Sequence, residues 1–138
     1  MILVAGGAFQ GKLQFSRELF RKISAGNGQQ GDFRPVIADG AVCTPEEAQK
    51  ADILNHFHEL IRRFPELFTD PAAFVSEWEA NCPDQVLVTN ELGYGVVPVD
   101  PEDRRWREQC GRVCTALAAQ CQQVYRVVCG IGVALKAE

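Results

Sequence analysis

The sequence predicts an α/β protein with a mostly parallel sheet and helices on both of its faces. Short apolar segments alternate with amphipathic segments along the chain, as in proteins built from strand–helix–strand units. The first apolar segment runs into a glycine-rich turn and then a helical pattern, which places a loop at the carboxyl end of a strand. The 138 residues are enough for one domain, expected to span 1–138.

Hydrophobic periodicity and capping residues set the expected elements. Phe15, Leu19 and Ile23 recur every four positions, as they would on one face of a helix. Thr44 is suited to cap a helix and Pro45 to begin it, within a segment that reads as helical to Phe64. In order, the predicted elements are a strand at 1–5, a helix at 12–23, a polar break at 24–32, a strand at 36–38, helices from 45 and over 71–80, a strand at 85–89, a helix at 101–122 and strands at 124–129 and 133–136.

Three of the predicted loops follow strands directly, namely residues 6–12, 39–40 and 90–98. The carboxyl ends of parallel strands meet at one edge of a sheet, where ligands bind in open α/β folds. We therefore expect these three loops to converge on one site.

Composition excludes several classes of function. The net charge of −4 gives no basic surface for nucleic acid. No apolar run approaches the roughly 20 residues that a membrane helix needs. No basic region precedes the first apolar segment, so a secretory signal is not expected and a cytoplasmic location is.

The six cysteines are predicted to bind no metal and to form no cross-link. Cys110, Cys114 and Cys121 fall on one face of a helix, where small apolar side chains filling a core contact are favoured over a metal site. No Cys-x-x-Cys pair is present, and a cytoplasmic setting disfavours disulfides.

The opening loop fits the pattern G-x-x-x-x-G-K, which is typical of phosphate-binding loops. Small residues let successive backbone N–H groups point toward a phosphate, and the helix that follows adds partial positive charge. A lysine at the end of the loop supplies a full charge to the outer phosphates of ATP or GTP. The nucleotide-binding residues are predicted to be Gly6, Gly7, Ala8, Phe9, Gln10, Gly11, Lys12 and Leu13.

Leu13 stands where such loops carry the Ser or Thr hydroxyl that ligates Mg²⁺. Leucine cannot ligate, but Mg²⁺ can be held by phosphate oxygens, water and a carboxylate. Asp39, at the end of a strand, is the first candidate for that carboxylate and Glu91 the next. For Asp39, a turn-forming Asp-Gly pair is an equally good interpretation.

The segment "VLVTNELGYGVVPVDPEDRRWREQCGRV", the opening loop and the closing "VYRVVCGIGVALK" together resemble the adenosylcobinamide kinase / adenosylcobinamide-phosphate guanylyltransferase family of cobalamin biosynthesis. The resemblance covers roughly residues 1–23 and 84–136. It implies a recombinase-type P-loop fold and phosphorylation of the aminopropanol hydroxyl of adenosylcobinamide by ATP or GTP. It also implies a homo-oligomer, with a trimer expected.

The resemblance also implies roles for single residues. Lys12 and Glu91 would be catalytic, although a carboxylate that closes a loop is an equally good interpretation of Glu91. Taken without the family, residues 102–108 ("EDRRWRE") are interpreted as the solvated start of a helix with Trp106 packed inward. The substrate-binding residues implied are Asn90, Glu91, Gly93, Gly95, Arg105 and Arg107.

The chain also departs from the family pattern. The histidine that accepts GMP lies in a His-Arg-x-x-Arg-Pro stretch that this sequence lacks. His56 and His58, the two histidines present, lie two positions apart and so face different sides of a helix. The family's strand-end aspartate has no clear counterpart, although Asp52 aligns with it.

Three functions remain open on these residues. The first is a kinase of adenosylcobinamide that lacks guanylyltransferase activity. The second is a non-catalytic nucleotide-binding relative, which Leu13 and the missing histidine favour. The third is a P-loop kinase of another small metabolite.

Overall fold

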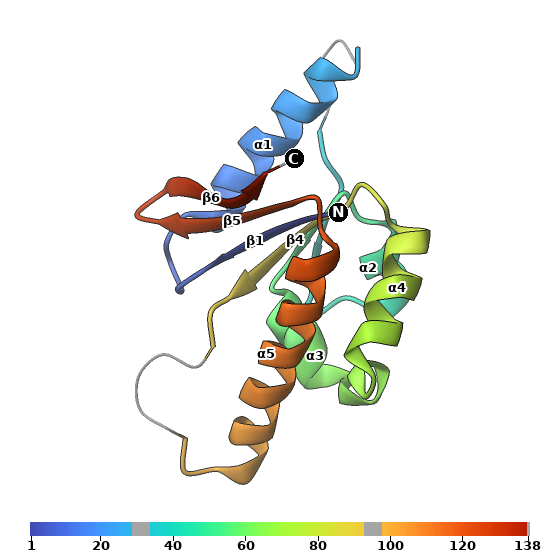
Figure 1. Ribbon diagram of the computed structural model, residues 1–138, viewed down its shortest axis with the longest axis vertical. Coiled ribbons are helices and arrows are strands. Elements are labelled where there is room, and N and C mark those ends of the chain that lie inside the picture. The colour runs from blue at the N-terminus through green and yellow to red at the C-terminus, as the bar shows by residue number, and fades with distance from the viewer. Residues whose placement is uncertain (29–33, 93–97, 138) are drawn as a thin grey trace.

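The computed structural model describes residues 1–28, 34–92 and 98–137 of the chain (Figure 1). Strands and helices alternate through most of it. In order they are β1 (Ile2–Gly6), α1 (Lys12–Gly26), β2 (Ile37–Asp39), α2 (Pro45–Lys50), β3 (Ile53–Asn55), α3 (Phe57–Arg63), the 3₁₀ helix η1 (Pro65–Phe68), α4 (Pro71–Asn81), β4 (Val86–Asn90), α5 (Pro101–Gln120), β5 (Gln123–Val128) and β6 (Ile131–Ala137).

The six strands form one sheet in the order β2-β3-β4-β1-β5-β6. Every neighbouring pair is parallel except β5 and β6, which form an antiparallel hairpin at one edge. Strand β1 lies between β4 and β5, and Gly6 at its end is level with Asn90. The predicted mostly parallel α/β architecture is confirmed.

Helices cover both faces of the sheet, as predicted (Figure 1). Helix α1 packs on one face through Leu13, Phe15, Leu19 and Ile23, against Val4 and other strand residues. Helices α2 to α5 pack on the opposite face, where the larger apolar cluster includes Leu3, Leu54, Phe57 and Leu117. Successive residues of β1 thus point into different clusters, which is why the whole strand is apolar.

The segment 43–64 differs from the prediction, because it is not one helical segment. The Thr44 side chain caps α2 as expected, but α2 ends at Lys50 and a strand, β3, follows. Ile53 and Leu54 are both fully buried, one in each apolar cluster. An apolar run as short as Ile53-Leu54 is compatible with a helix or a strand. It forms a strand here because it is buried between β2 and β4.

Helix α1 is longer than predicted, because it continues through Ser24 to Gly26. Gly28 follows with a φ of +80°, the left-handed conformation that commonly ends a helix. The break therefore begins a few residues later than the polar composition indicated.

The cysteines that were predicted to fill the core do so in part. Cys110 and Cys121 are buried in the larger apolar cluster, and Cys114 is half-buried beside them. Burial raises the pKa of the Cys121 thiol to about 11, so this group stays protonated at neutral pH. All six cysteines are free thiols. Among the described helices, none combines the length and apolar character needed to cross a bilayer.

The ends of β2 and β3 approach each other closely at Gly40. A Cβ atom there would overlap the backbone carbonyl of His56 and lie 3.2 Å from the Asn55 oxygen. The Gly40 N–H donates to that same Asn55 oxygen at 2.8 Å. Only glycine allows this approach.

We expect Gly40→Ala to destabilise the protein by about 1–3 kcal/mol, because the methyl group meets backbone that cannot rotate away. The free energy of unfolding in urea measures this. Gly111→Ala is the matched control, because a Cβ there meets open space within α5 and should stabilise by about 0.5–1 kcal/mol. Equal stability of the two variants would contradict the close approach at Gly40.

Candidate functional site

Residues Gly6–Lys12 form a tight loop between β1 and α1, as the motif predicted. A Cβ on Gly6 would lie 2.5 Å from the Val127 oxygen, so no larger residue fits. Gly11 and Phe9 both have left-handed φ angles, +83° and +58°. The side chain of Phe9 is fully exposed. A non-glycine residue held at positive φ is uncommon and indicates a loop whose shape is imposed by its surroundings.

Lys12 is the first residue of α1 and is only 8% exposed. Its ammonium Nζ donates to the Gly7 oxygen at 2.6 Å, so it folds back over the loop. Burial lowers the pKa of Lys12, and the negative charge of Glu91 partly offsets this effect. A phosphate in the loop would offer Nζ a charged partner in place of the carbonyl.

The turn of the β5–β6 hairpin holds the loop in place. The backbone N–H of Cys129 donates to Gln10 Oε1 at 2.7 Å, and the N–H of Gly130 donates to the Gln10 backbone oxygen at 2.7 Å. Cys129 and Gly130 both have positive φ, as a two-residue hairpin turn requires. A single loop residue, Gln10, thus accepts both hydrogen bonds from the turn of the β5–β6 hairpin.

A cavity of about 280 Å³ lies against the loop. Residues of two of the three predicted loops, 8–12 and Asn90, line it together with Asn55 and His56. Asp39, from the third predicted loop, does not line the cavity but is hydrogen-bonded to His56. Leu13 lines the cavity and also packs against the α1-side cluster, so it supplies no oxygen to a metal. The lining residues are Ala8, Phe9, Gln10, Gly11, Lys12, Leu13, Gln14, Asn55, His56 and Asn90.

Glu91 follows β4 and forms an ion pair that the sequence did not predict. Arg126 of β5 donates to both of its carboxylate oxygens, with Nε at 2.8 Å from Oε1 and Nη2 at 3.2 Å from Oε2. The pair crosses the end of β1, and the Glu91 N–H donates to the Gly6 oxygen at 2.8 Å. This geometry fits the loop-closing interpretation of Glu91, and its catalytic role stays a prediction.

Asp39 contacts His56 at the ends of β2 and β3. Its Oδ1 accepts from His56 Nδ1 at 2.8 Å and from the Ala41 N–H at 2.9 Å. Partial burial opposes ionisation of Asp39, but these two hydrogen bonds, together with the charge interactions with His56 and Arg63, outweigh it and lower the pKa. Magnesium binding by Asp39 stays a prediction. The bond to the Ala41 N–H fits the alternative interpretation of Asp39–Gly40 as a turn. The contact with His56 was not predicted from the sequence.

Asp52 lies at the amino end of β3, which is the end opposite the cavity. It immediately precedes β3, and its Oδ2 accepts from the Val36 N–H at 2.8 Å. The residues at the carboxyl end of β3, on the cavity side, are Asn55 and His56. Asp52 therefore cannot act at the phosphate loop, and the resemblance aligns it with the wrong end of the strand.

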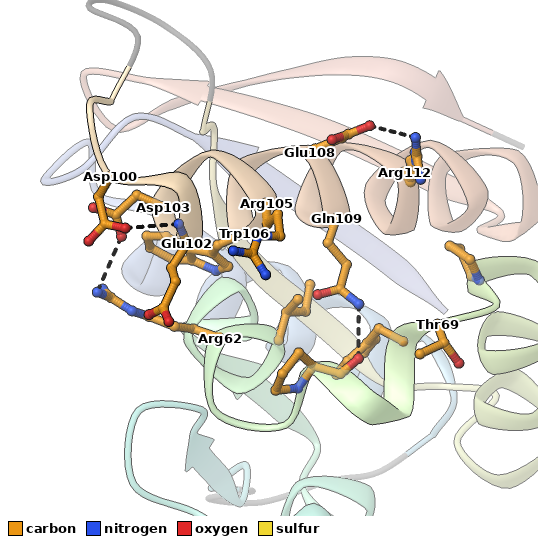
Figure 2. Close-up of a pocket in the computed structure, with 14 residues that line it drawn as sticks. Arg62, Thr69, Asp100, Glu102, Asp103, Arg105, Trp106, Glu108, Gln109 and Arg112 are labelled. Atoms are coloured by element: carbon orange, nitrogen blue, oxygen red, sulfur yellow. Dashed lines mark hydrogen bonds and ion pairs between the residues drawn. The ribbon is translucent and has the colours of Figure 1, made fainter.

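Four of the six predicted substrate residues lie away from this cavity or outside the described residues. Arg105 on α5 lines a separate hollow of about 650 Å³ between α5 and the α3–η1–α4 segment, with Arg62 and Trp106 nearby (Figure 2). Arg107 lies on the same helix and is half-buried. Gly93 and Gly95 fall outside the described residues. Of the residues the resemblance assigned to substrate, Asn90 lines the cavity and Glu91 adjoins the loop.

His58 is the buried histidine of the pair. Its Nδ1 accepts from the Asn90 N–H at 3.1 Å, and its backbone oxygen accepts from Trp106 Nε1 at 2.7 Å. It ties α3 to both β4 and α5. Burial, together with the nearby His56 and Lys12, lowers the pKa of His58 to about 4, so it is neutral in the folded protein near pH 7.

A known protein family matches the larger, C-terminal part of the chain. The family model described as cobinamide kinase / cobinamide phosphate guanyltransferase matches residues 49–135, more than half of the chain. The opening loop lies outside the matched residues. The resemblance seen in the sequence is thus confirmed.

The relatives found among curated proteins are named as bifunctional adenosylcobalamin biosynthesis proteins. The bifunctional adenosylcobalamin biosynthesis protein CobU of Salmonella typhimurium is 50% identical over 56 residues, which cover 40% of this chain and 31% of the relative. The Escherichia coli protein of the same name gives the same values. CobP of Pseudomonas aeruginosa is 40% identical over 53 residues, 38% of this chain and 31% of the relative. The chain matches less than a third of the length of each relative.

His58 should make stability fall in acid. Above pH 6.5 both folded and unfolded states carry a neutral imidazole, so the group has no effect. As the pH falls from 6.5 toward 4, the unfolded chain binds a proton that the folded protein does not, with a loss on the order of 3 kcal/mol. Urea unfolding from pH 4 to 8 measures the loss.

His58→Asn is the control for that measurement. Its side-chain oxygen can still accept from the Asn90 N–H, but it does not titrate. The difference between the two stability profiles isolates the histidine from carboxylates that titrate in the same range. Identical slopes in the two proteins would contradict a buried, neutral His58.

Proposed function

Because the chain belongs to the cobinamide kinase / cobinamide phosphate guanyltransferase family, we propose that it phosphorylates adenosylcobinamide with ATP or GTP as donor. The observation that carries the proposal is the Gly6–Lys12 loop, with a buried ammonium beside a cavity at the carboxyl ends of the strands. The names of the relatives, which describe bifunctional adenosylcobalamin biosynthesis proteins, support a substrate from that pathway.

In the proposed reaction the chain's main task is to bind and orient the triphosphate. Backbone N–H groups of the loop and the start of α1 would receive the β- and γ-phosphates, and Lys12 Nζ would move from the Gly7 oxygen to them. The acceptor hydroxyl oxygen forms a bond to the γ-phosphorus, the bond to the β-phosphate oxygen breaks, and the nucleoside diphosphate leaves. Mg²⁺ bound to the triphosphate would supply charge neutralisation.

Phosphate oxygens and water would provide most of the Mg²⁺ ligands. Leu13 has no oxygen to offer, and the carboxylates of Asp39 and Glu91 already accept from His56 and Arg126. The guanylyltransferase activity is proposed to be absent, because the sequence contains no His-Arg-x-x-Arg-Pro stretch. Assembly as a trimer stays a prediction from the resemblance.

The alternative is a protein that binds nucleotide without transferring phosphate. Leu13 favours it, because the hydroxyl that orients the metal in active loops is missing and its place is taken by a core-packing side chain. Both functions require nucleotide binding, but only the kinase transfers phosphate to an acceptor.

Nucleotide binding is tested first, by calorimetric titration with ATP and with GTP, each with and without Mg²⁺. Lys12→Met keeps the buried stem and removes the charge, so we expect affinity to fall about 10- to 100-fold. Lys22→Met is the control, since Lys22 is exposed on the same helix. Equal affinities in the two variants would reject the loop as the nucleotide site.

Transfer of the radiolabelled γ-phosphate to adenosylcobinamide separates the two functions. The unaltered protein is expected to form adenosylcobinamide phosphate. Binding without transfer, together with a gain of transfer in Leu13→Ser, would instead establish the non-catalytic alternative. Transfer to a different small alcohol, with none to adenosylcobinamide, would correct the substrate and keep the kinase.

A further inference from the structure

We propose that His56, held by Asp39, is the general base that takes the proton from the acceptor hydroxyl during phosphoryl transfer. The inference rests on the proposed kinase function and goes beyond it by assigning a catalytic residue that neither the loop motif nor the family resemblance supplies. Asp39 is its positioning residue.

The first observation is where the chain places the imidazole. His56 directly follows β3 and immediately precedes α3, and it lines the same cavity as Lys12 and Leu13. Its φ angle of +53° is left-handed, a conformation that costs free energy in any residue other than glycine. The ring is about half exposed, so a ligand in the cavity can reach it.

The second observation is the hydrogen bond that orients the ring. Asp39 Oδ1 lies 2.8 Å from His56 Nδ1, and the Ala41 N–H and the Arg63 charge help to keep that carboxylate ionised. An ionised carboxylate can only accept, so Nδ1 carries the hydrogen. The lone pair of the neutral ring is then on Nε2, which has no hydrogen-bond partner in the described part of the chain. A carboxylate holding one ring nitrogen so that the other can take a proton is a recurring catalytic arrangement.

The third observation is that the other ionisable groups at this edge are already engaged. Glu91 is held by both nitrogens of Arg126 that face it. His58 is buried, and its Nδ1 accepts from the Asn90 N–H. Lys12 is a donor and is needed for the phosphates. Of the described groups at the cavity, His56 alone combines exposure, an oriented ring and an unused acceptor atom.

The proposed step is balanced. As the acceptor oxygen bonds to the γ-phosphorus, its proton passes to His56 Nε2, giving an imidazolium that the Asp39 carboxylate stabilises. The bond between the γ-phosphorus and the β-phosphate oxygen breaks, and the nucleoside diphosphate leaves with the electron pair. The imidazolium later returns its proton to solvent, through the exposed side of the ring.

Two substitutions test the base without disturbing the backbone. His56→Asn tolerates positive φ and keeps a donor able to reach Asp39, but it has no atom in the position of Nε2. We expect single-turnover transfer to fall about 100-fold or more, with nucleotide affinity within two-fold of the unaltered protein. His56→Gly also tolerates the backbone and leaves space for added imidazole, which should restore at least a tenth of the lost rate.

Asp39→Asn tests the positioning residue. Its amide can no longer stabilise the imidazolium or enforce the tautomer, so we expect the transfer rate to fall about 10-fold or more while KM for nucleotide stays unchanged. If Asp39 and His56 had only a structural role, their substitution would instead lower thermal stability and nucleotide affinity together, and imidazole would not restore transfer in His56→Gly.

The outcomes separate this inference from the proposed function. Transfer to adenosylcobinamide that survives in His56→Asn within three-fold overturns the base and leaves the kinase standing. A second outcome is that the protein transfers no phosphate to adenosylcobinamide but hydrolyses the nucleotide, with water in place of the alcohol. If this hydrolysis depends on His56 and imidazole restores it in His56→Gly, the result rejects the substrate and supports the base. Nucleotide binding with neither transfer nor hydrolysis overturns both.

Discussion

The missing side chain at Gly6 is the constraint on which the rest of the site depends. A Cβ atom there would meet the Val127 oxygen at 2.5 Å and the stem of Lys12 at 3.3 Å. Because β1 pairs with both β4 and β5, its end is enclosed on two sides, and only a residue without a side chain lets the loop turn there. Glu91 and Arg126 can then bond across the strand end, next to the loop rather than in its place.

Two further contacts fix the loop from outside the parallel strands. Gln10 receives two N–H groups from the hairpin turn, one on its side chain and one on its backbone. Lys12 is bound to Gly7 within the loop itself. The loop is thus held by the protein's own contacts, so a phosphate bound there would require little further ordering of the chain.

Much of the fold was predictable because its signals are local. The strand–loop–helix start, the Thr44 cap and the long α5 depend on neighbouring residues, and all three are confirmed. Strand β3 was missed because its identity depends on burial between two distant strands. The same holds for the site, since Arg126 meets Glu91 and Asp39 meets His56 across 35 and 17 positions of sequence. A histidine at a strand end, next to a loop, was the available signal for the second pair.

The anchoring of α3 fixes one wall of the cavity. His58 is bonded to β4 through Asn90 and to α5 through Trp106, so the first turn of this helix is clamped to the core immediately beyond His56. The glycine-rich wall is tied to the sheet as well, through Gln10 to the hairpin turn and through the Glu91 N–H to the Gly6 oxygen. With both walls anchored in this way, the width of the cavity follows from the spacing of the strands themselves.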